Sequence, residues 1–166
     1  MTSISALENI HKKGLFGDHQ GKNENELTNV SEVKHLQIIQ IVQYKKSTLQ
    51  IASLNLDNLK FPEAPMQVNS NKDTRILWSG PSNWLLVSTK KDILNSVQKI
   101  CDDKNFAVTD LSHSRAIIEL KGSNSKEVLK KGCPINLNEF KVNNCANSVF
   151  HGITITIDMI SNEPET

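Results

Sequence analysis

Residues 108–137 read VTDLSHSRAIIELKGSNSKEVLKKGCPINL, from Val108 to Leu137, and this stretch decides the fold. In its middle, six residues alternate between one set of side chains facing one way and a second set facing the other. The first set is Ala116, Ile118 and Leu120, and the second is Ile117, Glu119 and Lys121. A period of two residues is typical of a half-buried strand, so residues 116–121 are predicted to be a strand.

The residues after this strand carry the signals of a turn followed by a short helix. The four residues from Gly122 onward suit a turn, and Asn124, with Glu127 three residues later, resembles the capping box that begins many helices. Gly132 is expected to take the left-handed conformation that ends a helix, and Pro134 prevents its continuation. The stretch therefore predicts a strand, a turn, a helix and a defined stop.

Hydrophobic periodicity predicts the elements on either side of this stretch. They are a strand over 35–44 that is buried on both faces, a helix over 45–56, strands over 75–78 and 84–88 joined by a turn at 80–83, a helix over 90–103, a strand over 106–111 and a last strand over 149–160. Short helices among many strands indicate the α+β class. We expect an antiparallel or mixed sheet with helices packed on one face.

Length and composition favour one folded domain behind a polar leader. The chain has 166 residues, which is enough for a single domain with a real core. Residues 1–30 are predicted to be a flexible N-terminal arm, in which residues 5–13 carry the apolar spacing of a short helix. This arm is either a disordered leader or a segment that docks on a partner. Residues 31–166 are predicted to form the α+β domain.

Charge and cysteine content exclude several classes of protein. The 19 basic and 18 acidic residues nearly cancel, and no basic block indicates nucleic-acid binding. The sequence has neither an apolar run of about 20 residues nor a signal-peptide core, so a cytoplasmic location is expected. The odd number and wide spacing of Cys101, Cys133 and Cys145 argue against a disulfide framework. Buried or half-exposed thiols are favoured over a mixed metal site of Cys145 with His151.

Several motifs carry a resemblance to a known family. Asp110-x-Ser112-His113, followed by an alternating strand, Gly122 and a short helix, resembles the folate-binding domain of the aminomethyltransferases. Residues 131–137, KGCPINL, and residues 75–87, RILWSGPSNWLLV, narrow this resemblance. The chain is similar there to the gamma subunits of heterotetrameric sarcosine oxidases, over roughly residues 33–158. The resemblance implies the folate-binding-domain type of α+β fold.

The resemblance also implies a role for the chain. It implies a non-catalytic structural subunit that buttresses the alpha subunit and works with alpha, beta and delta subunits. Their complex would demethylate sarcosine oxidatively and pass the one-carbon unit to tetrahydrofolate. The implied cofactors lie elsewhere: NAD and tetrahydrofolate in alpha, FAD in beta, FMN between alpha and beta, and zinc in delta. The equivalent subunit of an N-methylglutamate dehydrogenase and a stand-alone folate-binding protein are the alternatives.

The family pattern continues beyond the last predicted strand with a further strand and an Arg-Ser-Phe-x-x-Ser segment, whereas this sequence reads NEPET over residues 162–166. We therefore expect the domain to lack the family's last strand. A sheet edge left open in this way is a place where another subunit could pair.

The candidate site residues are interface positions rather than catalytic ones. Asp110, Ser112 and His113 have the residue types of a catalytic set, but adjacent residues at a strand end more often cap backbone N–H groups. No catalytic, cofactor-binding or metal-binding residue is predicted in this chain. The interface candidates, chosen by residue type, are Trp78, Trp84, Phe106 and His113. For folate binding, the three aromatic residues would form apolar walls and Asp110 or Glu119 would supply a carboxylate.

Overall fold

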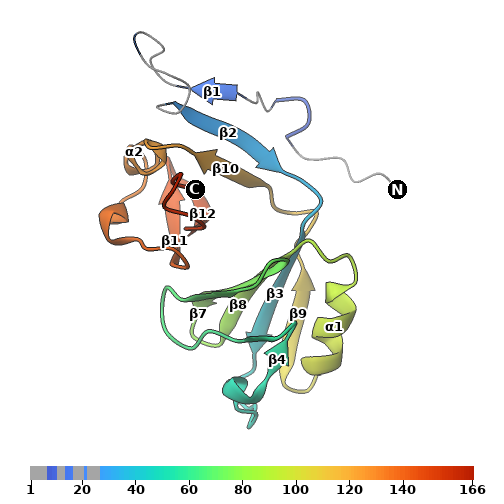
Figure 1. Cartoon of the computed structure of the whole chain (residues 1–166). Coiled ribbons are helices and arrows are strands. Elements are labelled where there is room, and N and C mark those ends of the chain that lie inside the picture. Colours follow the sequence, from blue (N-terminus) through green and yellow to red (C-terminus); the bar gives the residue numbers. More distant parts are fainter. Residues whose placement is uncertain (1–6, 11–13, 17–20, 22–26) are drawn as a thin grey trace. The chain divides into compact units, whose positions relative to one another are not determined.

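The computed structural model describes residues 7–10, 14–16, 21 and 27–166, and this part of the chain forms two compact units (Figure 1). The central unit is His35–Arg115, and the terminal unit joins the residues up to Lys34 with Ala116–Thr166. Strand is the predominant secondary structure, at 41% against 14% for helix. The sequence predicts a single α+β domain over 31–166. Within the described residues the division into units falls at residues 34 and 115, because the strand that ends at Val33 pairs with the strand that begins at Ile117 and not with the strand that follows it in the sequence.

The central unit is built on a five-stranded antiparallel sheet in the order β6-β7-β8-β3-β9. Its strands are β3 (Gln37–Gln43), β6 (Val68–Ser70), β7 (Thr74–Gly80), β8 (Asn83–Ser88) and β9 (Phe106–Asp110). The β7–β8 hairpin turns at the predicted position, where Ser82 has a φ of 55°. Strand β3 is confirmed as buried on both faces, since consecutive residues Ile38 and Ile39 are 4% and 0% exposed.

One face of this sheet carries the core of the central unit. Helix α1 (Ile93–Ile100) packs against it, and the apolar stripe predicted for this helix points inward. The buried members of the core are Ile39, Ile41, Leu56, Phe61, Ile76, Trp84, Leu86, Ile93, Val97, Cys101 and Phe106. The helix is shorter than the predicted range 90–103, beginning after Asp92 and ending before Cys101.

The helix predicted over 45–56 is wrong. These residues form a 3₁₀ turn, η2 (Ile51–Ser53), followed by the short antiparallel strands β4 (Asn55–Leu56) and β5 (Leu59–Lys60). The Ser47 hydroxyl accepts from the backbone N–H of Leu49 at 3.2 Å, and the Gln43 side chain donates to the Leu49 carbonyl at 2.9 Å. Such local side-chain bonds occupy backbone groups that a helix would need.

The terminal unit begins with a three-stranded antiparallel sheet in the order β1-β2-β10. Its strands are β1 (Gly14–Phe16), β2 (Thr28–Val33) and β10 (Ile117–Lys121), so the strand predicted over 116–121 is confirmed. The sheet includes parts of the predicted N-terminal arm. Residues 7–10 form a turn, in which Ile10 N–H donates to the Leu7 carbonyl at 3.0 Å. The rest of the helix predicted over 5–13 lies outside the described residues.

The predicted short helix follows β10 as α2 (Ser125–Lys130), with Asn124 at the N-cap. The Asn124 side chain makes no capping hydrogen bond. Gly132 does not take the predicted left-handed conformation. A glycine is required at this position because there is no room for a side chain. A Cβ at Gly132 would lie 2.8 Å from the Phe150 ring and 2.9 Å from the His151 ring.

The strand predicted over 149–160 covers the end of one strand, a turn and a second strand. These belong to a hairpin of β11 (Cys145–Phe150) and β12 (Ile153–Asp158), paired in antiparallel register. His151 and Gly152 form its turn, with φ of 47° and 86°, as a two-residue type I′ turn requires. Between α2 and β11 lies the 3₁₀ turn η3 (Leu137–Glu139). Leu137, Phe140 and Met159 form a second small core at the base of the hairpin.

Candidate subunit interface

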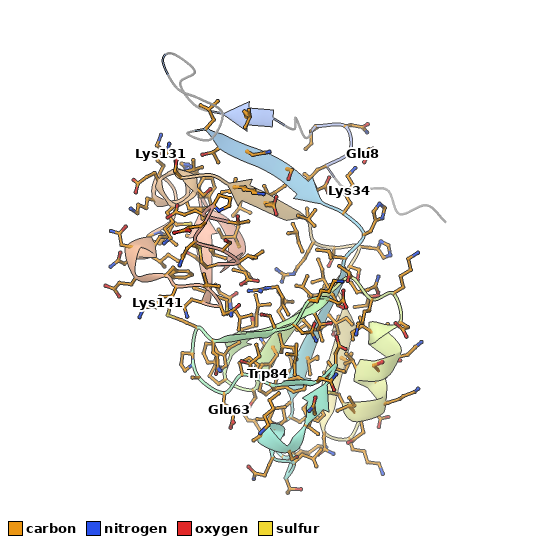
Figure 2. The ribbon with its side chains drawn as sticks, viewed as in Figure 1. Glu8, Lys34, Glu63, Trp84, Lys131 and Lys141 are labelled. Carbon is orange, nitrogen blue, oxygen red and sulfur yellow. The ribbon has the colours of Figure 1, made fainter. Side chains whose placement is uncertain are left out.

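Trp84 lies in the core of the central unit rather than on a surface (Figure 2). It sits on β8, its side chain is 3% exposed, and its indole Nε1 donates to the Pro62 carbonyl at 2.8 Å. The Phe61 ring meets the indole edge-on, with centroids 5.5 Å apart. A buried Trp needs a partner for its N–H, and the loop that carries Phe61 and Pro62 provides one. Trp84 therefore fastens this loop to the sheet.

Phe106 is also part of the core. It begins β9 and is 2% exposed within the same cluster as Ile41 and Val97. Trp84 and Phe106 were predicted as interface candidates, but both are buried in the core. Neither side chain reaches the surface of the unit that contains it. The cause is the sheet pairing, which brings their strands under α1 and the loop at residue 61.

Trp78 and His113 remain at the surface of the central unit. Trp78 lies opposite Trp84 in the β7–β8 register and is half-buried, while its backbone N–H donates to the Gln67 carbonyl at 3.0 Å. His113 is exposed in the turn after β9. These two are the predicted interface residues that a second chain can reach.

The Asp110–Ser112 pair forms a structural turn at the end of β9. The Ser112 hydroxyl donates to Asp110 Oδ1 at 2.5 Å and accepts from the Ile38 N–H at 3.0 Å, and the Ser112 N–H also donates to the carboxylate at 2.9 Å. These hydrogen bonds from Ser112, with a smaller contribution from His113, hold the pKa of Asp110 below its usual 3.8 despite some burial. The serine proton points at a carboxylate, so the arrangement ties β9 to β3 and is not that of a nucleophile with a base.

A polar cluster fixes the β4–β5 turn to the sheet. The Asp57 carboxylate accepts from the Thr74 hydroxyl at 2.5 Å, from the Asn71 amide at 3.2 Å and from the Lys90 ammonium group. Thr74 and Ser88 are fully buried, with their hydroxyl oxygens 2.9 Å apart. Burial disfavours the charged carboxylate, but these hydrogen bonds outweigh it and lower the pKa of Asp57. The cluster joins three segments, so its evident role is structural.

One cavity lies in the terminal unit of the described residues. This cavity of about 440 Å³ is lined by Ser123 and by Asn162, Glu163, Pro164 and Glu165, without an aromatic wall. The Trp84 and Phe106 rings that would have stacked on a pteridine are inside the core. Among the residues that the structure describes, no group of three or more His, Cys, Asp or Glu could hold a metal ion.

All three cysteines, Cys101, Cys133 and Cys145, are buried, and none of them forms a disulfide. Burial, with a smaller contribution from the neighbouring Asp102, raises the pKa of the Cys101 thiol to about 12, so this thiol stays protonated near neutral pH.

The helices that the structure describes include none with the length and apolar character of a membrane span.

The sequence reasoning missed a set of exposed aliphatic side chains in the terminal unit. They are Ile118, Val142, Val149, Ile153 and Ile160, which are between 38% and 69% exposed. A pattern of alternating Ile and Thr in β12 signals a strand, but it does not reveal which of the Ile residues the core fails to cover. Their exposure is known only once the hairpin turn is placed.

These features define a class: a β-rich chain whose conspicuous aromatic residues mainly build its core, and which leaves scattered apolar side chains exposed. Comparison with known proteins identifies the family. Residues 47–163 match the model of the sarcosine oxidase, gamma subunit family, and the chain belongs to that family.

Two curated relatives are sarcosine oxidase gamma subunits. That of Corynebacterium sp. (strain U-96) is 31% identical over 87 residues, covering 51% of this chain and 42% of the relative. That of Corynebacterium sp. (strain P-1) is 32% identical over 78 residues, covering 44% and 38%. The chain thus spans about two fifths of the length of the curated relatives it matches.

A solved structure resembles a larger part of the chain. It is a heterotetrameric sarcosine oxidase from Corynebacterium sp. U-96 in complex with pyrrole 2-carboxylate, and one of its chains matches with a TM-score of 0.70 and 25% sequence identity. The match covers 80% of this chain and 70% of that chain. The similarity therefore extends to both units of the fold.

Proposed function

We propose that this chain is a non-catalytic structural subunit of a heterotetrameric sarcosine oxidase. The observation that carries the proposal is the structural match, at a TM-score of 0.70, to a chain of such an oxidase, together with membership of the gamma subunit family. The arrangement of the candidate residues supports it. The Asp110–Ser112 pair and the Asp57 cluster are used to hold strands and turns together.

In this proposal the chemistry belongs to the other subunits. The complex oxidises the methyl group of sarcosine with oxygen as the acceptor and transfers the one-carbon unit to tetrahydrofolate. FAD, FMN, NAD, tetrahydrofolate and zinc are assigned to alpha, beta and delta subunits, and the complex to the cytoplasm. This chain contributes a rigid surface, and the folate-binding-domain type of fold is proposed for it from its family resemblance.

Rigidity is what such a role needs from the chain. In the central unit, an antiparallel sheet with fully buried Ile39, Ile76 and Leu86 resists deformation, because a well-packed interior has few alternative arrangements. A preformed surface loses less conformational entropy when another subunit binds. The proposal therefore predicts that the chain contributes to assembly and stability of the oxidase and not to the chemical step.

The proposal is tested by purifying the tagged chain gently from its native cells and recording an absorbance spectrum. We expect flavin absorption, companion chains, and oxygen consumption that depends on sarcosine. N-methylglutamate serves as the comparison amine, since a related dehydrogenase would prefer it. The same chain purified alone from a heterologous host is the control and is expected to be colourless and inactive. Sarcosine oxidation by the isolated chain would refute the non-catalytic role.

A further inference from the structure

Met66 carries the most accessible sulfur atom among the residues that the structure describes. This residue is 38% exposed. The other described residues that contain sulfur are each at most 7% exposed, and they are Cys101, Cys133, Cys145 and Met159. An exposed sulfur can meet a dissolved oxidant while the chain stays folded, whereas a buried sulfur waits for an opening of the structure. Met66 therefore differs from the other sulfur atoms in its access to oxidants.

Met66 lies at the tip of a tight turn over residues 64–67. The Gln67 N–H donates to the Ala64 carbonyl at 3.3 Å, Pro65 takes the second position of the turn, and Met66 takes the third with a φ of 64°. This is the pattern of a type II turn, whose third position is usually glycine or asparagine. The turn itself thus places a long thioether side chain where a small residue is usual, and the side chain is exposed there.

The turn is fastened to the sheet on both sides, so Met66 is exposed without any loosening of the loop. After it, the Gln67 carbonyl accepts from the Trp78 N–H at 3.0 Å. Before it, the Pro62 carbonyl accepts from the indole N–H of Trp84 at 2.8 Å (Figure 2). A change at the exposed thioether is therefore expected to leave the packing around Trp84 intact.

The reaction proposed for the complex supplies an oxidant. Oxidation of an amine to an imine releases two electrons and two protons, and their transfer to oxygen gives hydrogen peroxide. A thioether sulfur attacks one oxygen of the peroxide, so that an S–O bond forms while the O–O bond breaks. The second oxygen leaves as hydroxide and takes the proton of the transferred hydroxyl group. The products are a sulfoxide and water.

We propose that Met66 is the site at which hydrogen peroxide modifies this chain, by conversion of its thioether to a sulfoxide. The inference rests on the proposed function for the source of the peroxide. The buried sulfur atoms are spared, because Met159 lies inside the second core and the Cys101 thiol stays protonated. The modified chain keeps its fold, and reductases can reverse the modification.

The first test treats the purified full chain with dilute hydrogen peroxide and follows the gain of oxygen at each methionine by peptide mass spectrometry. We expect Met66 to react roughly tenfold faster than Met159, or more. In urea the two rates should converge, because unfolding removes the difference in burial. Met1 lies outside the described residues and is quantified on its own peptide. Equal rates for Met66 and Met159 in the folded chain would overturn the proposal.

The second test uses the assembly purified from native cells through the tagged chain, during turnover of sarcosine with and without catalase. We expect sulfoxide at Met66 to accumulate with turnover and to fall severalfold when catalase removes the peroxide. Met66→Leu is the matched variant, since leucine has a similar volume and no sulfur. It should keep the urea midpoint and the sarcosine-dependent oxygen consumption of the wild type.

The outcomes separate this proposal from the proposed function. If Met66 stays unmodified while the assembly releases peroxide, the proposal fails and the subunit role stands, because another subunit then covers the turn. An assembly that consumes no oxygen with sarcosine contradicts the proposed function, whereas the reaction of the purified chain with added peroxide does not depend on it. Catalase-sensitive sulfoxide at Met66, with Met159 unmodified, is the result that the proposal requires.

Discussion

Asp57→Asn is the change that tests the structural reasoning most sharply, because it removes a charge while keeping the shape of the side chain. Asp57 has a φ of 54° in the β4–β5 turn, a left-handed conformation that Asn tolerates well. The new amide oxygen can still accept from the Thr74 hydroxyl. The substitution therefore isolates what the negative charge contributes to the cluster of Thr74, Asn71 and Lys90.

The magnitude follows from the burial of each partner. Thr74 is fully buried, and its bond to a carboxylate is worth about 1 kcal/mol more than the same bond to a neutral amide. The Lys90 side chain is 39% exposed, so water screens the ion pair and its contribution is small. We expect Asp57→Asn to lower the free energy of unfolding by about 1–2 kcal/mol.

Urea unfolding followed by tryptophan fluorescence measures this loss. Both tryptophans, Trp78 and Trp84, lie in the central unit with Asp57, so the signal reports the unfolding of that unit. The midpoint should fall while the dependence of free energy on urea stays unchanged. Asp103→Asn is the matched control, since Asp103 is exposed. This substitution should change the free energy of unfolding by less than about 0.5 kcal/mol.

The pH dependence provides a second measurement. Because hydrogen bonds hold the pKa of Asp57 below its usual 3.8 in the folded chain, the charge stabilises the fold fully above that value. This stabilisation is lost as the pH falls through the lowered pKa of Asp57. The difference in free energy of unfolding between wild type and Asp57→Asn should therefore narrow below pH 3.8. A difference under about 0.3 kcal/mol at neutral pH, or one that does not narrow on acidification, would refute the reasoning.

Further predictions concern two glycines and one cysteine. Gly122→Ala should destabilise the chain more than Gly132→Ala in urea unfolding followed by circular dichroism. A Cβ at Gly122, whose φ is 140°, would lie 2.4 Å from the Leu27 carbonyl oxygen, whereas a Cβ at Gly132 meets the Phe150 ring, which can shift. We expect Gly132→Ala to lower the free energy of unfolding by about 1–3 kcal/mol. Equal losses of free energy for the two substitutions would contradict this reasoning. Cys101, with its pKa raised to about 12, should react with iodoacetamide at pH 8 only after unfolding, and rapid labelling of the native chain at this residue would contradict its burial.

Local signals predicted the elements well wherever the turn chemistry was recognisable. The Gly80–Asn83 turn between two apolar runs predicted the β7–β8 hairpin, and the stripe of Ile93, Val97 and Cys101 predicted the buried face of α1. The turn at His151–Gly152 lacks the common Asn-Gly or Asp-Gly pair, so the strand predicted over 149–160 ran through this turn.

Features that depend on distant partners could not be predicted in this way. The division into two units follows from the pairing of Val30 with Leu120, which lie far apart in the sequence. The residue type also does not distinguish buried Trp84 from half-buried Trp78, since both are tryptophans on strands of one hairpin. Residue type identifies candidates for an interface, and only the packing of other elements decides which of them stay exposed.

The most direct test of the subunit role is the native mass spectrum of the assembly purified through this chain, recorded beside its sarcosine-dependent oxygen consumption. The account predicts one copy of this chain in a complex with three other chains, carrying flavin and active on sarcosine. A chain that is recovered alone or only with copies of itself, without flavin and without activity, would contradict it.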